Sequence, residues 1–214
     1  MAKTIICSHG FAVRADSMGM FTDIAVAFPD YEFRMFDYYD IQPNGDQIVR
    51  SLDEQAAILQ KQIDAAPDGE IVLLCHSQGS TVAGLVDLSR VSKAILLAPP
   101  VEISRASLIN RMRHRKGVRL NPRGMSIIPR TNGTTMRIPV EYMDSIEAHD
   151  RLTLYRAMAT KIPTVIVRAT DDEILGLTQL EQIEGAKIVD INADHNFTGQ
   201  GRERLIDTLR GILL

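Results

Sequence analysis

Six short stretches of the chain are rich in apolar, β-branched or aromatic residues and have the length of strands. Most read as nearly continuous apolar runs, which is typical of strands buried on both faces of a parallel sheet. They occupy residues 4–8, 31–38, 70–74, 93–97, 163–168 and 186–191.

Between these runs, apolar side chains recur at the spacing of an amphipathic helix. The pattern predicts helices over residues 18–28, about 46–66, the stretch that follows Ser77, 177–183 and 202–213. Strands that alternate with helices over short connections predict an α/β protein. We expect a parallel sheet of about six strands, flanked by helices and joined by right-handed crossovers.

The alternation breaks between residues 101 and 162. A helical pattern over residues 103–114 is followed by two β-like runs around Asn132-Gly133, a strong hairpin signal. Two further helices are predicted over residues 140–147 and 150–160. This length and structure exceed those of a loop, so we expect residues 101–162 to form an inserted cap, or lid. The core would then comprise residues 1–100 and 163–214.

The composition is that of an ordinary globular protein. Of the 214 residues, 45% are hydrophobic and 24% are charged. The N-terminus leads directly into a strand-like run without the apolar region of a signal peptide, and no apolar segment is long enough to cross a bilayer. We therefore expect a cytoplasmic protein with no membrane span.

Charge is distributed unevenly along the chain. Residues 101–138 contain nine basic side chains and one acidic one, Glu102, which leaves −11 on the remainder of a chain whose net charge is −3. A basic insertion docked on an acidic body accounts for this asymmetry, and an anionic substrate or surface is the alternative. The negative net charge predicts no binding of nucleic acid.

No cofactor is suggested by the sequence. Cys7 and Cys75 lie in apolar runs, which indicates buried free thiols rather than a disulfide or a metal site. No dinucleotide fingerprint, P-loop or metal-ligand spacing is present. We expect neither a metal nor an organic cofactor.

Three kinds of catalytic side chain follow strands of the predicted sheet. Ser77 comes after the run 70–74, Asp171 and Asp172 come after 163–168, and His195 comes after 186–191. The carboxyl ends of parallel strands meet at one edge of a sheet, so these groups are expected to gather there. A serine hydroxyl becomes nucleophilic when a histidine oriented by a carboxylate accepts its proton.

At these residues the sequence resembles the α/β-hydrolase fold family. Cys75-His76-Ser77-Gln78-Gly79 is similar to that family's Gly-x-Ser-x-Gly motif, with Cys75 in place of the first glycine. The order serine, acid, histidine is also the family's order. The resemblance covers the whole chain apart from residues 101–162, and it implies a hydrolase core with an inserted cap.

The resemblance also implies individual roles. His9-Gly10-Phe11 resembles the family's His-Gly-x loop, so the backbone N–H groups of Phe11 and Gln78 are expected to form the oxyanion hole. Matching Ala169 to a glycine of the family pattern makes Asp172 the acid, with Asp171 as the alternative.

We therefore expect a serine hydrolase that cleaves a carboxylic ester through an acyl-enzyme on Ser77. Peptide, amide, thioester or C–C bond hydrolysis uses the same groups and remains open, because a fold does not choose among them. Two non-catalytic alternatives are a binding protein of the same fold and an interaction module whose basic cap binds an acidic partner. The expected partner is a small-molecule ester or related acyl substrate, and a homodimer is retained as a candidate assembly.

Overall fold

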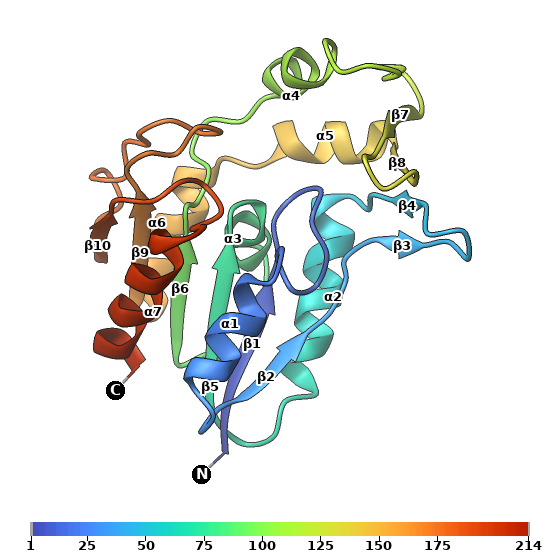
Figure 1. Cartoon of the computed structure of the whole chain (residues 1–214). Helices are drawn as coiled ribbons and strands as arrows, with labels where there is room; N and C mark the ends of the chain where they lie inside the picture. The colour runs from blue at the N-terminus through green and yellow to red at the C-terminus, as the bar shows by residue number, and fades with distance from the viewer. Residues whose placement is uncertain (1, 214) are drawn as a thin grey trace.

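A six-stranded, wholly parallel sheet lies at the centre of the structure, a computed structural model that describes residues 2–213. Its strands lie side by side in the order β10-β9-β6-β5-β1-β2 (Figure 1). The bounds are β1 (Ala2–Ser8), β2 (Glu32–Met35), β5 (Gly69–His76), β6 (Lys93–Leu97), β9 (Thr164–Ala169) and β10 (Ala186–Ile191). The predicted parallel sheet of about six strands is confirmed.

Helices cover both faces of this sheet. One face carries α1 (Met20–Ala27) and α7 (Gln200–Leu213), and the other carries α2 (Leu52–Asp64), α3 (Gln78–Ala83) and α6 (Arg151–Lys161). Successive residues of β5 point to opposite faces, so Leu73 packs into one apolar core and Leu74 into the other. Burial on both faces explains why the central strands read as continuous apolar runs.

Helix α2 begins later than the sequence pattern suggests. The Ser51 hydroxyl accepts a hydrogen bond from the Glu54 N–H (3.3 Å), and the Glu54 carboxylate accepts one from the Ser51 N–H (2.9 Å). This capping box fixes the first turn of the helix. The predicted start near residue 46 is wrong because β4 (Gln47–Ile48) is extended and pairs with a strand of the inserted segment.

The helix predicted over residues 177–183 is also absent, and these residues form turns and irregular backbone. Two of their carbonyl groups accept hydrogen bonds from arginine side chains. Arg168 donates to the Thr178 carbonyl (3.0 Å), and Arg156 donates to the Gln182 carbonyl (2.9 Å). Leu180 and Ile183 are nevertheless buried, which explains why the apolar pattern resembled that of a helix.

The inserted segment (residues 101–162) lies over the carboxyl ends of the central strands as far as residue 148 (Figure 1), and its last helix, α6, packs on a face of the sheet. It contains α4 (Arg105–Met112), β7 (Ser126–Pro129), β8 (Thr135–Ile138), α5 (Val140–Ala148) and α6. The strands β7 and β8 form the hairpin predicted around Asn132-Gly133. A second sheet, in the order β3-β4-β8-β7, joins this hairpin to β3 (Asp40–Ile41) and β4 of the preceding core segment.

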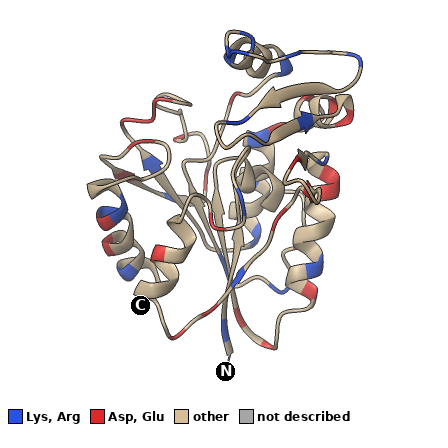
Figure 2. Cartoon of the chain, turned by 45° about the vertical axis from the view of Figure 1, so that its right-hand side comes forward, with Lys and Arg blue, Asp and Glu red and all other residues tan. Residues whose placement is uncertain are grey.

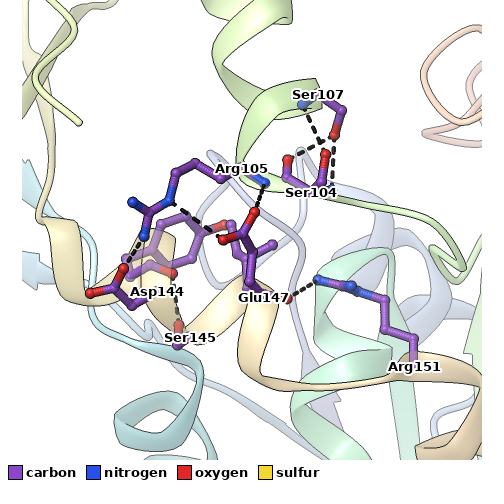
Figure 3. Close-up of polar contacts among 9 residues, drawn as sticks. Ser104, Arg105, Ser107, Asp144, Ser145, Glu147 and Arg151 are labelled. Carbon is purple, nitrogen blue, oxygen red and sulfur yellow. Dashed lines mark hydrogen bonds and ion pairs between the residues drawn. The ribbon is translucent and has the colours of Figure 1, made fainter.

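Helix α4 is held against α5 by polar contacts (Figure 3). The Arg105 side chain forms ion pairs with Asp144 and Glu147 of α5. Ser104 and Ser107 cap the start of α4. Part of the basic charge in this segment is therefore neutralised within the protein. Within residues 2–213, no helix combines the length and apolar character that a bilayer span requires.

Candidate active site

Ser77 lies at the sharp turn between β5 and α3, at the carboxyl edge of the sheet. Its backbone adopts φ 50° and ψ −124°, a conformation that is costly for a residue with a side chain. The Ser77 N–H donates a hydrogen bond to the Leu97 carbonyl (2.8 Å), which anchors the turn to the end of β6.

Two glycines allow other parts of the chain to approach this turn. A Cβ atom on Gly79 would lie 2.1 Å from the carbonyl oxygen of Ser8, so no side chain fits there unless β1 moves. A Cβ atom on Gly10 would lie 3.1 Å from the Cβ of Ser77. The close contacts bring the end of β1 and the loop after it against the Ser77 turn.

Cys75 replaces the first glycine of the motif and is fully buried in the core on the α2 side of the sheet. Burial raises the pKa of its thiol, which keeps the sulfur protonated and poorly nucleophilic. The hydroxyl of Ser77, and not the thiol of Cys75, forms the hydrogen bond with His195.

Ser77, His195 and Asp172 form a hydrogen-bonded chain. His195 Nε2 lies 3.0 Å from Ser77 Oγ, and His195 Nδ1 lies 2.7 Å from Asp172 Oδ2. A carboxylate accepts hydrogen bonds, so its position assigns the proton of the neutral ring to Nδ1 and leaves the Nε2 lone pair for the serine hydroxyl. This arrangement allows His195 to accept a proton from Ser77.

Asp172 is buried, and its other carboxylate oxygen accepts hydrogen bonds from the N–H groups of Ile174 (2.9 Å) and Leu175 (2.7 Å). Burial acts to raise the pKa of this carboxyl group. The hydrogen bonds from His195 and the two amides outweigh that effect, and the pKa is lowered. Asp172 is therefore held as a carboxylate beside the histidine.

Asp171, the alternative acid, points elsewhere. Its carboxylate accepts a hydrogen bond from the Asn192 side chain (2.6 Å) and is exposed. On the other side of Asp172, Glu173 accepts a hydrogen bond from the backbone N–H of His195 (3.1 Å). Of the two candidate aspartates, the structure brings Asp172 to His195.

His76 supports the backbone of His195. Its Nε2 donates to the His195 carbonyl (3.0 Å), and its Nδ1 accepts from the Ser17 hydroxyl (2.9 Å). Burial, with a smaller contribution from His195, lowers the pKa of His76 to about 3, so this ring is neutral. No sequence signal links Ser17 to this site, because it meets His76 only in the folded chain.

His9 holds the loop after β1 in place. Its Nδ1 donates to the Gly10 carbonyl (2.8 Å), and its Nε2 accepts from the N–H of Tyr38 (3.1 Å). Both ring nitrogens are used in structural hydrogen bonds, and burial lowers the pKa of the ring. These bonds fix Gly10 and the following Phe11 beside the Ser77 turn.

The two predicted oxyanion donors share a neighbour, Tyr142 of α5. The ring of Phe11 stacks on that of Tyr142 with a centroid separation of 5.3 Å, and the Tyr142 hydroxyl donates to Oε1 of Gln78. The side chain of Gln78 in turn donates to Gln55 of α2 (2.9 Å). Within residues 2–213, neither the Phe11 nor the Gln78 backbone N–H donates to a protein acceptor.

A cavity of about 350 Å³ opens above Ser77 and His195, between the strand ends and the inserted segment. Apolar side chains from both parts line much of it, namely Phe11, Ile103, Leu108, Met112, Ile146 and Leu175. Arg111, Arg115 and Arg151 also line it. Across residues 2–213, no three His, Cys, Asp or Glu side chains are grouped as ligands for a metal ion.

The molecule was compared with proteins of known structure. It superposes on Est1E from Butyrivibrio proteoclasticus with a TM-score of 0.70 at 15% identity, covering 99% of this chain and 87% of the other. A thermophilic esterase from Thermogutta terrifontis gives 0.67 at 18% identity, covering 100% and 90% of the two chains. A pyrethroid hydrolase from Sphingobium faniae JZ-2 gives 0.67 at 16% identity, covering 99% and 97%.

No protein-family model and no curated protein sequence matches this chain. At the identities above, the structural likeness concerns the fold. The sheet order, the sharp turn at Ser77 and the superposition over nearly the whole chain agree with one another. The chain has the α/β-hydrolase fold.

Proposed function

We propose that the protein is a serine hydrolase that cleaves a carboxylic ester, with Ser77 as nucleophile, His195 as base and Asp172 as the acid that orients it. The observation that carries this proposal is the hydrogen-bonded chain of Ser77, His195 and Asp172, with separations of 3.0 and 2.7 Å, at the floor of a cavity. The esterases and hydrolases among its structural neighbours support the same chemistry.

In the first half of the proposed reaction, Ser77 Oγ attacks the ester carbonyl carbon while His195 Nε2 takes the hydroxyl proton. Negative charge develops on the carbonyl oxygen, and the N–H groups of Phe11 and Gln78 stabilise it. Loss of one such donor typically lowers turnover about 10²- to 10³-fold. His195 then gives its proton to the leaving alcohol as the acyl-enzyme forms.

In the second half, a water molecule gives a proton to His195 and attacks the acyl carbon. Collapse of the second intermediate releases the carboxylic acid and returns the proton to Ser77. Residues 101–162 serve in this proposal as the lid that shapes the acyl and alcohol sites, since Ile103, Leu108 and Met112 of this segment line the cavity.

An active-site fluorophosphonate tests the nucleophile directly. Wild-type protein should be labelled at a single site, and Ser77→Ala should not be labelled. Ser89 is exposed and lies outside residues 101–162, so Ser89→Ala should be labelled like the wild type. Folded wild-type protein that resists labelling would favour a non-catalytic binding protein of the same fold.

A substrate panel then tests the bond that is cleaved. Nitrophenyl esters of graded chain length should be hydrolysed, and hydrolysis should disappear in Ser77→Ala. Faster turnover of a matched thioester, amide or peptide by the same serine would replace the ester in the proposal and leave the nucleophile unchanged.

A further inference from the structure

The cavity above Ser77 carries positive charge without an acidic counterpart in its wall. Arg111, Arg115 and Arg151 line it, and among the described lining residues there is no Asp or Glu. All three arginines belong to residues 101–162 and line the same cavity as Ser77. Figure 2 shows Lys and Arg positions, in blue, on the part of this segment that lies above the strand ends.

Arg151, the first residue of α6, is only 6% exposed. Its Nη1 donates to the Ile103 carbonyl (3.0 Å) and its Nη2 to the Ile146 carbonyl at the end of α5 (3.2 Å). Figure 3 shows the Arg151 side chain extending toward α5. Its Nε has no acceptor within residues 2–213, and no carboxylate there pairs with it. Burial lowers the pKa of Arg151, which marks a charge that the protein does not fully compensate.

The other two arginines contrast with their neighbours in the same segment. Arg105 is neutralised by α5, and Arg137 pairs with Asp46 at 3.5 Å. Arg111 and Arg115 are exposed, and neither forms an ion pair within the part of the chain that the structure describes. Arg105 and Arg137 are thus paired with carboxylates of the protein, whereas the two arginines of this stretch that line the cavity are not.

We propose that the substrate is an ester that carries a second, anionic group, a carboxylate or a phosphate, which Arg111, Arg115 and Arg151 bind. The inference rests on the proposed esterase function and adds a substrate class to it. Guanidinium groups match the oxygens of both anions with paired, charge-assisted hydrogen bonds. The apolar wall around Phe11, Leu108 and Met112 would hold the hydrocarbon that joins the anion to the ester.

Arg151 also has a structural role, because its two carbonyl contacts join the start of the inserted segment to the end of α5. That role alone predicts an effect of substitution on stability. A structural role predicts no preference of the enzyme for a charged over an uncharged ester. Substrate preference therefore distinguishes binding of the anion from a structural role.

The kinetic test compares esters that differ in charge. The pair is the 4-nitrophenyl monoester of glutaric acid and 4-nitrophenyl pentanoate, and a third ester carries a phosphonate in place of the free carboxylate. Wild-type kcat/KM should be about 10- to 100-fold higher for a charged ester, as expected from charge-assisted hydrogen bonds. The preference should shrink as salt is added, because two of the arginines are exposed.

The variants test which side chains produce the preference. In the double variant Arg111→Gln/Arg115→Gln the ratio of kcat/KM values should fall at least about tenfold. The control Arg119→Gln/Arg123→Gln removes the same charge from exposed positions outside the cavity and should keep the wild-type ratio. The proposal would be overturned if both double variants gave the same ratio of kcat/KM for the charged over the neutral ester. A wild-type enzyme that prefers the neutral ester would also overturn it.

Binding to Ser77→Ala separates this inference from the proposed function. Calorimetric titration with glutarate and with inorganic phosphate should show binding that is lost in the Arg111→Gln/Arg115→Gln background, and the tighter ligand would identify the anion. Binding without ester turnover in the wild type would retain the anion site and refute the esterase. Ester turnover by the wild type, with no binding of either anion and no charge preference, would refute the anion site and retain the esterase.

Discussion

Adjacent residues at the end of β9 have different environments, although both are aspartates. The backbone after Asp172 turns so that the N–H groups of Ile174 and Leu175 reach one carboxylate oxygen, while His195 reaches the other. Asp171 faces outward and contacts Asn192. The difference of one position along the chain thus decides which carboxylate lies beside the histidine.

Substitution of these two aspartates tests the assignment. Asp172→Asn should lower kcat by about 10³- to 10⁴-fold, because an amide no longer stabilises the imidazolium or fixes the tautomer with its proton on Nδ1. Asp171→Asn should retain most of the wild-type turnover. Both variants are isosteric, so circular dichroism and thermal melting check that the fold is kept; a reversed order of the two activities would transfer the role to Asp171.

At the scale of secondary structure, α5 connects the inserted segment to the Ser77 turn. Tyr142 contacts both residues whose N–H groups are the proposed oxyanion donors, through a ring stack with Phe11 and a hydrogen bond to Gln78. Preorganised donors stabilise a developing oxyanion because they need no reorganisation during the reaction. We infer that α5 positions these donors as well as covering the cavity.

Removal of one hydroxyl tests this link. Tyr142→Phe keeps the stack on Phe11 but loses the bond to Gln78, and we expect about a tenfold fall in kcat, part of the loss seen when a donor is removed. The matched control is Tyr155→Phe. The hydroxyl of Tyr155 is also buried, but it contacts Thr81 (3.2 Å) and the Pro100 carbonyl (3.0 Å) and not Gln78.

Both substitutions should cost about 1 kcal/mol of unfolding free energy, since each removes a buried hydrogen-bonding group. Only Tyr142→Phe should reduce kcat. Equal kcat values for the two variants would show that the Tyr142 hydroxyl contributes to packing and not to the position of the donors.

At the scale of the whole molecule, the free energy of unfolding depends on pH through buried neutral histidines. His76 has a pKa of about 3 in the fold, against its ordinary value of 6.5, and burial lowers that of His9 as well. Between pH 3 and pH 6.5, His76 binds a proton in the unfolded chain but not in the folded chain. Stability is therefore lost as the pH falls below 6.5.

Denaturant unfolding between pH 6.5 and 5 measures this dependence. Each histidine that stays neutral in the fold should lower the unfolding free energy by up to about 1.4 kcal/mol per pH unit. His76→Gln should show a smaller slope by about that amount, and His114→Gln, at an exposed position, serves as the substitution control. Asp172 does not affect the unfolding free energy in this range. Its lowered pKa contributes stability that is lost only as the pH falls toward and below 3.8.

An unchanged slope in His76→Gln would contradict the neutral, buried state of this ring. The effect belongs to the whole molecule because His76 joins the Ser77 turn, the loop at Ser17 and the loop of His195. Protonation of the ring would break its acceptor bond from the Ser17 hydroxyl and place an uncompensated charge inside the protein.

The sequence by itself determined the parallel sheet and the edge at which the candidate residues gather. Apolar runs bounded by helical patterns require burial on both faces, and strands of one direction place their following residues together. The hairpin at Asn132-Gly133 was predictable for a similar reason, because its turn chemistry is local. Those features depend on neighbours along the chain.

Tertiary structure decided the features that depend on contacts between residues distant in the sequence. Gln47–Ile48 continues a helical pattern but pairs with β8, and residues 177–183 form irregular backbone that contacts Arg156 and Arg168. Only the folded chain brings Tyr142 to Phe11 and leaves Arg151 at the cavity with no paired carboxylate among residues 2–213. Local patterns carry no information about such contacts, because their free energies arise from packing and charge between segments that meet only after folding.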